Sequence, residues 1–373
     1  MKKELRGGYT TGACMAAGVK AALHYMTEGD RLQSLILTAL DGTPLTIPVK
    51  AIEPLGDPSV DGVRVEIIKE SGDDPDITNG ASVFTITRLK PEQSGVTYHA
   101  GEGIGHVTKP GLQVPVGEPA INIGPRKLVQ TVVDELLGPG AGVDVEVSIP
   151  AGTELAKRTL NPILGVVGGI SVIGSTGVLR PMSEEGFKNS LVPQIDVAMA
   201  MGYDAIVFVP GKIGETQAVK HGINEQVIVQ TSNFIGFMLE AAEQRGVKEL
   251  LLFGHIGKLA KVAAGVFHTH NRVGDARLET MAAYGAMHGL PSGGVKRVLE
   301  SITTEDAMSV FSEYHLEKVY DVIARRASER AMRFVFGNIK IGTVLVTLKG
   351  EVLGMDENAK VIGQKLGWDM NNA

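Results

Sequence analysis

The sequence predicts an α/β protein built from two domains. Residues 1–155 are expected to form an N-terminal α+β domain, and residues 156–373 a Rossmann-like α/β domain with a mainly parallel sheet and a helical C-terminal part. Up to about residue 150, most segments show the alternating or clustered apolar pattern of strands, whereas from Gly165 onward strand and helix patterns alternate. Such alternation is typical of parallel strands joined by crossover helices. The 373 residues suffice for two domains.

The N-terminal domain is expected to begin with a helix. Thr10 or Thr11 is a suitable N-cap, and Gly29-Asp30 ends the helix after about Met26. Alanines on one flank of this helix favour very close packing. The other elements predicted for this domain are strands at Leu35–Ala39, Pro44–Ile52, Val60–Ile68, Ala81–Leu89 and Val143–Ile149, and a helix at Arg126–Leu137.

The C-terminal domain is expected to open on buried strand. Ile163–Val167 and Ile170–Ile173 consist of leucine and β-branched residues apart from Gly165 and Ser171. Further strands are predicted at Ala205–Val209, Val227–Gln230, Glu249–Phe253 and Ile339–Leu348, the last followed by a short tail. Helices are predicted at Ser183–Met201, Glu215–His221, Asn233–Arg245, Gly254–His268 and, in several pieces, Leu278–Val335. Ligands are expected at the carboxyl ends of these parallel strands.

Composition and charge narrow the class of protein. The net charge of −6 argues against nucleic acid as the main partner. Cys14 is the only cysteine, so an intrachain disulfide is excluded, and we expect this thiol to be buried. The run between Arg158 and Arg180 has no charged residue, but it contains five glycines and several polar residues, which makes it a poor membrane span. We therefore expect a cytoplasmic protein with no membrane contact. The sequence leaves a homo-oligomer open.

The first candidate site is the glycine-rich stretch Gly168–Gly177. It follows a predicted buried strand, and a polar helix start comes soon after it at Ser183. The segment Gly174-Ser175-Thr176-Gly177 has no bulky side chain, so a ligand can approach the backbone closely. A strand, a glycine loop and a helix start form the usual opening of a nucleotide-type site, which predicts an adenosine-containing cofactor here.

The second candidate site is the segment Gly101–Pro125, in which six glycines and four prolines alternate with polar side chains. The prolines exclude a regular helix and confine any strand to a sheet edge. Long ordered loops of this kind usually carry function. The polar residues of interest are Glu102, His106, Lys109, Glu118 and Asn122.

The third candidate site is the segment Gly254–Asp275, which begins at the end of a predicted strand. Lys258 and Lys261 share a face near a helix N-terminus, an arrangement that suits an anion, although most lysine pairs are simply solvated.

Two histidines in the same segment raise the question of a metal. His268 and His270, with Asp275, have the ligand types for zinc or cobalt. No further Cys or His stands at convincing spacing, so we rank polar contacts to a substrate above metal ligation and expect no protein-bound metal. The absence of G-x-S-x-G, Walker A and H-E-x-x-H motifs weakens hydrolase, NTPase and metalloprotease readings.

Four segments in this order resemble the CbiD family. They are R-G-G-Y-T-T-G-A-C at Arg6–Cys14, G-E-G-I-G-H-V-T-K-P-G-L-Q-V-P-V-G-E-P-A-I-N at Gly101–Asn122, G-G-I-S-V-I-G-S-T-G-V-L-R-P-M-S at Gly168–Ser183 and G-H-I-G-K-L-A-K-V-A-A-G at Gly254–Gly265. That family contains the cobalt-precorrin-5B C1-methyltransferases of anaerobic cobalamin biosynthesis. The resemblance spans the chain from near its start to beyond residue 260.

The resemblance implies a methyltransferase acting in cobalamin biosynthesis. S-adenosylmethionine would be the methyl donor and a cobalt corrinoid the acceptor, so the cobalt would belong to the substrate. Methyl transfer from a sulfonium needs an in-line nucleophilic carbon and a water-poor site, but no protein nucleophile. The many carboxylates of the acceptor call for cationic and N–H-rich contacts.

The resemblance also implies roles for individual residues. The cofactor is assigned to Gly168, Gly169, Ser171, Gly174, Thr176 and Gly177, with Glu215 for the ribose hydroxyls. The acceptor is assigned to Thr10, Thr11, Lys109, Glu118, Asn122, Arg126, Gly254, His255, Gly257, Lys258, Lys261, His270 and Arg272. The candidates for removing a proton from the acceptor are His106, Glu102 and His268.

Two other functions stay open at this stage. A glycine-rich strand–loop–helix also suits an NAD(P)-dependent tetrapyrrole reductase, although no G-x-G-x-x-G stands at a strand-to-helix junction. A non-enzymatic corrinoid or cobalt carrier using His268 and His270 is the second alternative. It predicts tight corrinoid binding without dependence on a cofactor.

Overall fold

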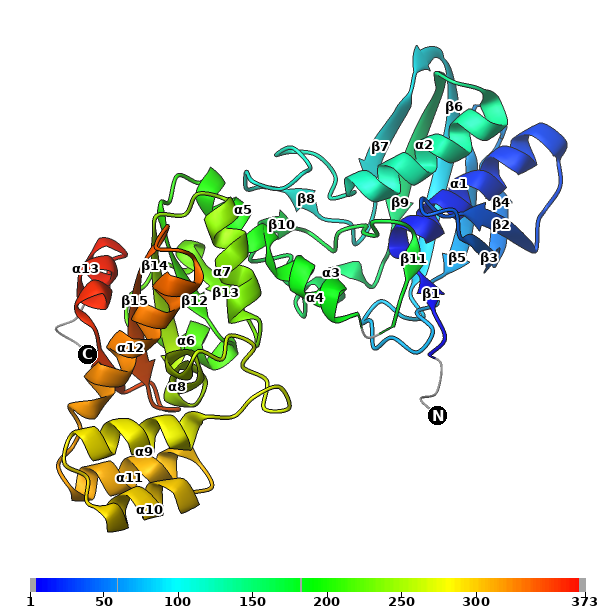
Figure 1. The fold of residues 1–373 in the computed structure, drawn as a ribbon. Helices are drawn as coiled ribbons and strands as arrows, with labels where there is room; N and C mark the ends of the chain where they lie inside the picture. Colours follow the sequence, from blue (N-terminus) through cyan, green and yellow to red (C-terminus); the bar gives the residue numbers. More distant parts are fainter. Residues whose placement is uncertain (1–4, 59, 182, 369–373) are drawn as a thin grey trace. The chain divides into compact units, whose positions relative to one another are not determined.

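The computed structural model describes residues 5–58, 60–181 and 183–368, and the chain divides into two units, Met1–Glu184 and Glu185–Ala373 (Figure 1). The first unit contains β1 (Gly8–Tyr9), α1 (Thr11–Glu28), β2 (Ser34–Thr38), β3 (Pro44–Pro48), β4 (Ala51–Pro54), β5 (Val63–Ile68), β6 (Ser82–Ser94), β7 (Val96–Ala100), β8 (His106–Val107), α2 (Ile123–Leu137), β9 (Ala141–Ser148), α3 (Gly152–Ala156), β10 (Val166–Val167) and β11 (Val178–Leu179).

The second unit begins at Glu185, within α4. It contains α4 (Glu184–Leu191), α5 (Pro193–Ala200), β12 (Ala205–Val209), α6 (Lys212–Lys220), the 3₁₀ turn η1 (Glu225–Val227), β13 (Ile228–Gln230), α7 (Ile235–Gln244), β14 (Glu249–His255), α8 (Ile256–Ala264), α9 (Arg277–Met287), α10 (Ser292–Glu300), α11 (Thr304–Glu313), α12 (Val319–Phe334), β15 (Lys340–Val346), β16 (Val352–Met355) and α13 (Glu357–Lys365).

The first unit is built on a five-stranded sheet in the order β4-β5-β6-β9-β7, antiparallel except for the β7–β9 pair. α1 packs on β5 and β6 and lies beside α2 (Figure 1). The α+β character predicted for the N-terminal part is confirmed. The strand predicted at Pro44–Ile52 is two strands, β3 and β4, interrupted at Val49 and Lys50.

The N-terminus of α1 forms as predicted. The Thr10 side chain accepts a hydrogen bond from the backbone N–H of Ala13 at 3.2 Å, and Gly29 ends the helix in a left-handed conformation. Gly18 faces Thr85 of β6 so closely that no β-carbon would fit there. Cys14 is fully buried, as expected, and burial raises the pKa of its thiol to about 12.

The boundary between the units lies later than predicted. Residues 156–184 belong to the first unit because they run back along its other loops: β10 pairs with β8, and β11 pairs with β1. Between these short strands, the backbone N–H of Val172 donates to the carbonyl of Ala120 at 2.8 Å. The predicted domain boundary at 155/156 therefore moves to Glu184.

The second unit is built on a five-stranded sheet in the order β13-β12-β14-β15-β16. β13, β12, β14 and β15 are parallel, and β16 is an antiparallel edge strand. The mainly parallel sheet is thus confirmed. Every residue of β12 is buried, as expected for a continuous apolar strand covered on both faces.

Helices cover the sheet of the second unit on both faces. Residues of α6 and α13 share a core with alternate residues of β12, β14 and β15, whereas α8 packs on α12 outside that core. α9, α10 and α11 pack on one another as a group inserted between α8 and α12 (Figure 1). This group supplies part of the site described below.

Three elements predicted for the second unit differ in the structure. The helix predicted at Ser183–Met201 is two helices, α4 and α5, because Pro193 opens a new helix at its first position. The helix predicted at Gly254–His268 ends at Ala264, where Gly265 takes a left-handed conformation. The expected C-terminal tail instead contains β16 and α13.

None of the helices in the described part of the chain has both the length and the apolar character needed to span a bilayer.

Candidate functional site

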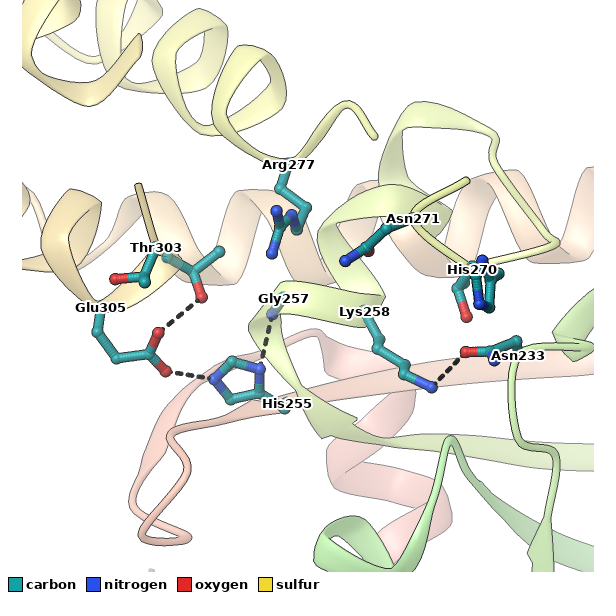
Figure 2. A pocket seen from close by; sticks show the side chains of 11 residues that line it. Asn233, His255, Gly257, Lys258, His270, Asn271, Arg277, Thr303 and Glu305 are labelled. Carbon is teal, nitrogen blue, oxygen red and sulfur yellow. Dashed lines mark hydrogen bonds and ion pairs between the residues drawn. The ribbon is translucent and has the colours of Figure 1, made fainter. Parts of the chain in front are cut away.

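A polar pocket of about 370 Å³ lies in the second unit at the carboxyl edge of its parallel sheet (Figure 2). β14 ends at His255, and the first turn of α8 continues from it. The loops after β13 and α8 and the starts of α9 and α11 supply the rest. The lining residues are Asn233, His255, Gly257, Lys258, Thr269, His270, Asn271, Arg277, Thr303, Thr304 and Glu305.

The topology explains where this pocket forms. β12 has β13 on one side and β14 on the other, so successive connections leave the sheet in opposite directions. α6, which follows β12, and α8, which follows β14, consequently pack in different layers. The crevice at such a switch point, at the carboxyl ends of the strands, is the usual ligand site of parallel α/β sheets.

The imidazole of His255 has a defined tautomer. Its Nδ1 accepts the backbone N–H of Gly257 at 3.1 Å, so the proton of the neutral ring is on Nε2. Nε2 then donates to Oε1 of Glu305 at 2.7 Å (Figure 2). The same contact with Gly257 makes His255 the N-cap of α8.

The Glu305 carboxylate is held from both of its oxygens. The Thr304 hydroxyl donates to Oε2 at 3.1 Å, while His255 donates to Oε1. Partial burial raises the pKa of the Glu305 carboxyl, but hydrogen bonds from its own backbone N–H and from His255 outweigh that effect, and the pKa lies below its usual value. The pocket therefore contains an ionised, oriented carboxylate at neutral pH.

Lys258 joins three segments around the pocket. Its ammonium donates to the carbonyls of Pro210 at 3.1 Å and Ser232 at 3.5 Å, and to the Asn233 side-chain oxygen at 2.6 Å. Burial and the nearby Lys261 lower the pKa of the Lys258 ammonium. An ammonium has three hydrogens, and all three are used here. This engagement argues against the predicted contact of Lys258 with acceptor carboxylates.

Lys261 does not form the predicted anion-binding face with Lys258. It is only 1 % exposed, and its ammonium donates to the carbonyls of Thr269 and Gly274 and to the side chain of Asn271. Its function in the fold is to hold the loop that follows α8. The spacing of the two lysines could not predict these contacts, because they arise only when the loop after α8 folds back onto that helix.

Arg277, the first residue of α9, pairs with Asp275 of the loop before it. Arg277 donates to both carboxylate oxygens of Asp275, at 2.7 and 2.6 Å. The hydrogen bonds from Arg277 lower the pKa of the Asp275 carboxyl. Asp275 is thereby engaged with a cation, and the ligand set of His268, His270 and Asp275 is not assembled among the described residues.

A row of rings leads to the pocket. The Phe187 and Phe234 centroids are 5.9 Å apart, those of Phe234 and His268 are 4.9 Å apart, and those of His268 and His270 are 6.5 Å apart. His270 is the member that lines the pocket, and its Nδ1 accepts the backbone N–H of Arg272. Arg272 is exposed.

Thr269 stands out among the lining residues. It is only 2 % exposed, and its hydroxyl has no hydrogen-bond partner among the described residues. A buried polar group without a partner costs free energy, so such a group beside a pocket points to a ligand that would satisfy it.

Close contacts between segments explain why glycine is needed at several positions of the first unit. A β-carbon on Gly169 would collide with the backbone at Gly103, and one on Gly174 would collide with the Thr10 side chain. The predicted strand–loop–helix is wrong, because Ile170 and Val172 form only isolated bridges and β10 and β11 have two residues each. The physical argument that placed the cofactor at Gly168–Gly177 is therefore lost.

The other residues predicted in the first unit fall into two groups. Thr11, Lys109 and Arg126 bond within the unit: the Thr11 hydroxyl to Ile173, Lys109 to the carbonyl of Ile163 at 3.0 Å, and Arg126 to Glu118 at 2.7 Å. Exposed residues in this unit include Glu102, His106 and Asn122. Ser171 donates to Asn161, and the Thr176 hydroxyl accepts from Val178 N–H.

The structure thus brings together only part of the predicted site. His255, Gly257, Lys258 and His270 line one pocket, and Gly254 packs on Pro210 beside it. Glu215 lies in α6, where it pairs with Lys212 and Gln230. Seven lining residues were missed: Asn233, Thr269, Asn271, Arg277, Thr303, Thr304 and Glu305. The capping box that starts α11 was the available signal for the last three.

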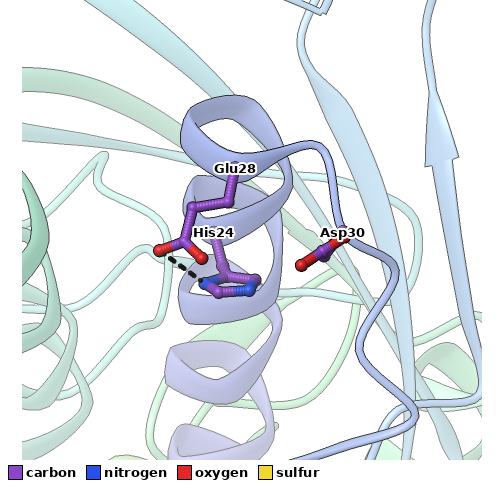
Figure 3. A group of neighbouring side chains, drawn as sticks. All are labelled: His24, Glu28 and Asp30. Atoms are coloured by element: carbon purple, nitrogen blue, oxygen red, sulfur yellow. Dashed lines mark ion pairs between the residues drawn. The ribbon is translucent and has the colours of Figure 1, made fainter.

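One group of metal-ligand side chains meets among the described residues, namely His24, Glu28 and Asp30 at the end of α1 (Figure 3). The His24–Glu28 contact of 3.4 Å is an ordinary i,i+4 pair, and both acidic residues are exposed. The group carries no independent sign of a bound cation.

A mainly parallel sheet with a pocket at its carboxyl edge is the architecture of many α/β proteins that bind small molecules. The chain belongs to the CbiD family. The family described as CbiD matches residues 1–181, close to the end of the first unit, and the CbiD C-terminal domain matches residues 268–357.

Two relatives match nearly from end to end. A protein of Moorella thermoacetica is 46% identical over 371 residues, 99% of this chain and 100% of its own, and one of Methanocaldococcus jannaschii is 44% identical over 355 residues, 95% and 97%. Both are named cobalt-precorrin-5B C(1)-methyltransferase. A crystal structure of a cobalamin biosynthesis protein (cbiD) from Archaeoglobus fulgidus aligns at 24% identity and a TM-score of 0.38, covering 74% of this chain and 84% of that one.

Proposed function

We propose that this protein is an S-adenosylmethionine-dependent methyltransferase that methylates C-1 of cobalt-precorrin-5B, giving cobalt-precorrin-6A, in cobalamin biosynthesis. The observation that carries the proposal is the near full-length identity of 46% to a relative named for that reaction. The acceptor carbon supplies the electron pair of the new C–C bond, and the S–CH₃ bond breaks. The sulfonium becomes the neutral thioether of S-adenosylhomocysteine.

We propose the pocket of the second unit as the cofactor site. Its volume of about 370 Å³ is near the lower end of the range of roughly 300–1,000 Å³ for small-ligand pockets. That size suits a nucleoside-sized ligand better than a corrinoid with its acid side chains. The engaged state of Lys258 and Lys261 supports the same choice, because a polycarboxylate needs free cations.

The acceptor is proposed to meet the exposed residues of the glycine-rich segments in the first unit. Glu102 and His106 are exposed there and are candidates for removing a proton from the corrinoid, and His268, whose ring lies beside that of His270, is the third candidate. A base is required only where the methylated product must lose a proton.

The reaction is tested by incubating the protein with cobalt-precorrin-5B and S-[methyl-¹³C]adenosylmethionine. The expected result is a labelled methyl at C-1 of the corrinoid and an equal amount of S-adenosylhomocysteine. Parallel calorimetric titrations with S-adenosylmethionine, S-adenosylhomocysteine and NADPH separate the alternatives. Binding of NADPH alone would favour a reductase, and corrinoid binding without labelled product would favour a carrier.

A further inference from the structure

The Glu305 carboxylate can only accept hydrogen bonds from a ligand, because an ionised carboxylate has no hydrogen to donate. Each carboxylate oxygen has two lone pairs. His255 uses one on Oε1 and Thr304 uses one on Oε2, at 2.7 and 3.1 Å. The Glu305 backbone N–H takes a third position, and its hydrogen bond also lowers the pKa of this carboxyl. One of the four acceptor positions therefore stays available, and a hydroxyl donor of a ligand matches it.

The surroundings of Glu305 exclude the obvious internal partners. Lys258 donates to Pro210, Ser232 and Asn233, and its hydrogens are used there. Arg277 forms its paired contact with Asp275. Neither cation is hydrogen-bonded to Glu305, although the Arg277 guanidinium is close enough for the two charges to attract each other. Glu305 therefore faces the pocket as an acceptor, which favours hydroxyl donors there.

The opposite end of the pocket supplies different groups. The side-chain oxygens of Asn233 and Asn271 accept from Lys258 and Lys261, at 2.6 Å each, so both amides present their NH₂ groups as donors. Thr269 also lines the pocket, and its buried hydroxyl has no partner in the described part of the chain. One end of the pocket thus has a carboxylate that accepts from hydroxyls, and the other end has amides that donate. This arrangement suits a ribose joined to a group with acceptor atoms.

We infer that Glu305 accepts a hydrogen bond from a ribose hydroxyl of the adenosyl cofactor and that His255 is the positioning residue that orients its carboxylate. This inference rests on the proposed function, since it requires a ligand with a ribose. It moves the ribose contact from Glu215 of α6, which pairs with Lys212 of the same helix and Gln230 of β13, to a helix of the inserted group.

Isothermal titration of the full chain with S-adenosylhomocysteine and with its 2′,3′-dideoxy analogue tests the contact. Each titration is run with and without saturating cobyrinic acid, a stable corrinoid. One hydrogen bond from a hydroxyl to a carboxylate predicts about 10- to 100-fold tighter binding of the natural ligand. Glu305→Gln is expected to remove most of that difference by weakening S-adenosylhomocysteine alone. Glu313→Gln, on the same helix and in a surface pair with Arg297, is the matched control.

His255→Asn tests the positioning function separately. Asparagine is a good N-cap, so it keeps the cap of α8 while it removes the contact with Glu305. The expected result is an unchanged melting temperature and a ratio of the two affinities reduced about 5-fold, as for the loss of one orienting hydrogen bond. An unchanged ratio would limit His255 to a structural function.

The outcomes separate this inference from the proposed function. If the wild-type protein binds neither ligand in either condition, the methyltransferase proposal fails together with the inference. If it binds S-adenosylhomocysteine but Glu305→Gln keeps the full preference over the dideoxy analogue, or if the wild type shows no preference, the ribose contact is overturned and the methyltransferase proposal stands.

Discussion

The two units differ in what their glycine-rich and polar segments do. In the first unit, Gly169 and Gly174 allow backbone segments to touch, and Arg126 is paired with Glu118. In the second unit, side chains from separate elements converge at the carboxyl edge of a parallel sheet. Glycine density therefore marks where loops cross, while the topology of the sheet marks where a small ligand fits.

The largest effect is expected from adjacent glycines of the first unit. Gly169→Ala places a β-carbon against the backbone at Gly103, so we expect it to destabilise the first unit by about 3 kcal/mol or more. Gly168→Ala has open space around it and a positive φ, so we expect a cost of about 1 kcal/mol. Thermal unfolding measures both.

The same two glycine variants test whether the cofactor binds only in the second unit. Both variants, where folded, are expected to keep the affinity of the wild type for S-adenosylhomocysteine. A loss of affinity in Gly168→Ala without a change in melting temperature would place the cofactor in the first unit after all.

The next effect concerns the loop that follows α8. Lys261→Met removes three donors and leaves the buried carbonyls of Thr269 and Gly274 without them, so we expect the unfolding free energy of the second unit to fall by about 2–3 kcal/mol. Denaturant titration measures it, with Lys296→Met on the exposed face of α10 as control. Unchanged stability together with weaker corrinoid binding would restore the anion site predicted from the sequence.

A smaller effect is expected from an ion pair of the first unit. Burial of Asp76 raises the pKa of its carboxyl, but hydrogen bonds from Lys69 and Thr78 outweigh it and lower the pKa in the folded state. A carboxyl with a lowered folded-state pKa stabilises the fold above its unfolded pKa, about 3.9, and loses this contribution as the pH falls through the folded value. We therefore expect the first unit to lose stability below about pH 4.

Asp76→Asn tests this pH dependence. The variant is expected to lose about 2 kcal/mol at neutral pH, because the buried Lys69 ammonium loses its counter-charge, and to show a flatter acid limb. Melting temperatures between pH 3 and pH 7 give the comparison, with the exposed Glu92→Gln as control. An acid limb as steep as that of the wild type would assign the loss to other carboxyls.

The smallest effect compares the same defect in both units. Thr85 in the first unit and Thr269 in the second each have a buried hydroxyl without a partner among the described residues, and only Thr269 lines the pocket. Replacement of either by valine is expected to change stability by less than about 1 kcal/mol. Thr269→Val alone is expected to weaken S-adenosylhomocysteine binding, by about 5-fold. Equal affinities in the two variants would remove Thr269 from the site.

Local patterns predicted the local structure well. The Thr10 cap of α1, the fully buried β12 and the strand that ends at the pocket follow from apolar runs and capping chemistry, which act over a few residues. The family resemblance at four segments is confirmed by the relatives. The sequence also predicted a ligand site at the carboxyl ends of parallel strands, and the pocket lies at that edge.

The remaining features depend on contacts between distant segments. Gly169 looked like a cofactor glycine because its crowding arises from Gly103, 66 positions earlier in the chain. Glu305 reaches His255 across 50 positions, through helices whose own sequence shows only ordinary caps and an amphipathic pattern. No local pattern reports which residues such a crossing brings together.

Hydrogen–deuterium exchange of the full chain, with and without saturating S-adenosylhomocysteine, tests most directly where the cofactor binds. We predict slower exchange in peptides that cover residues 254–274 and 300–306, around the pocket, and unchanged exchange in residues 165–177. Protection confined to residues 101–126 and 165–177 would contradict the account and return the cofactor to the glycine-rich segments of the first unit.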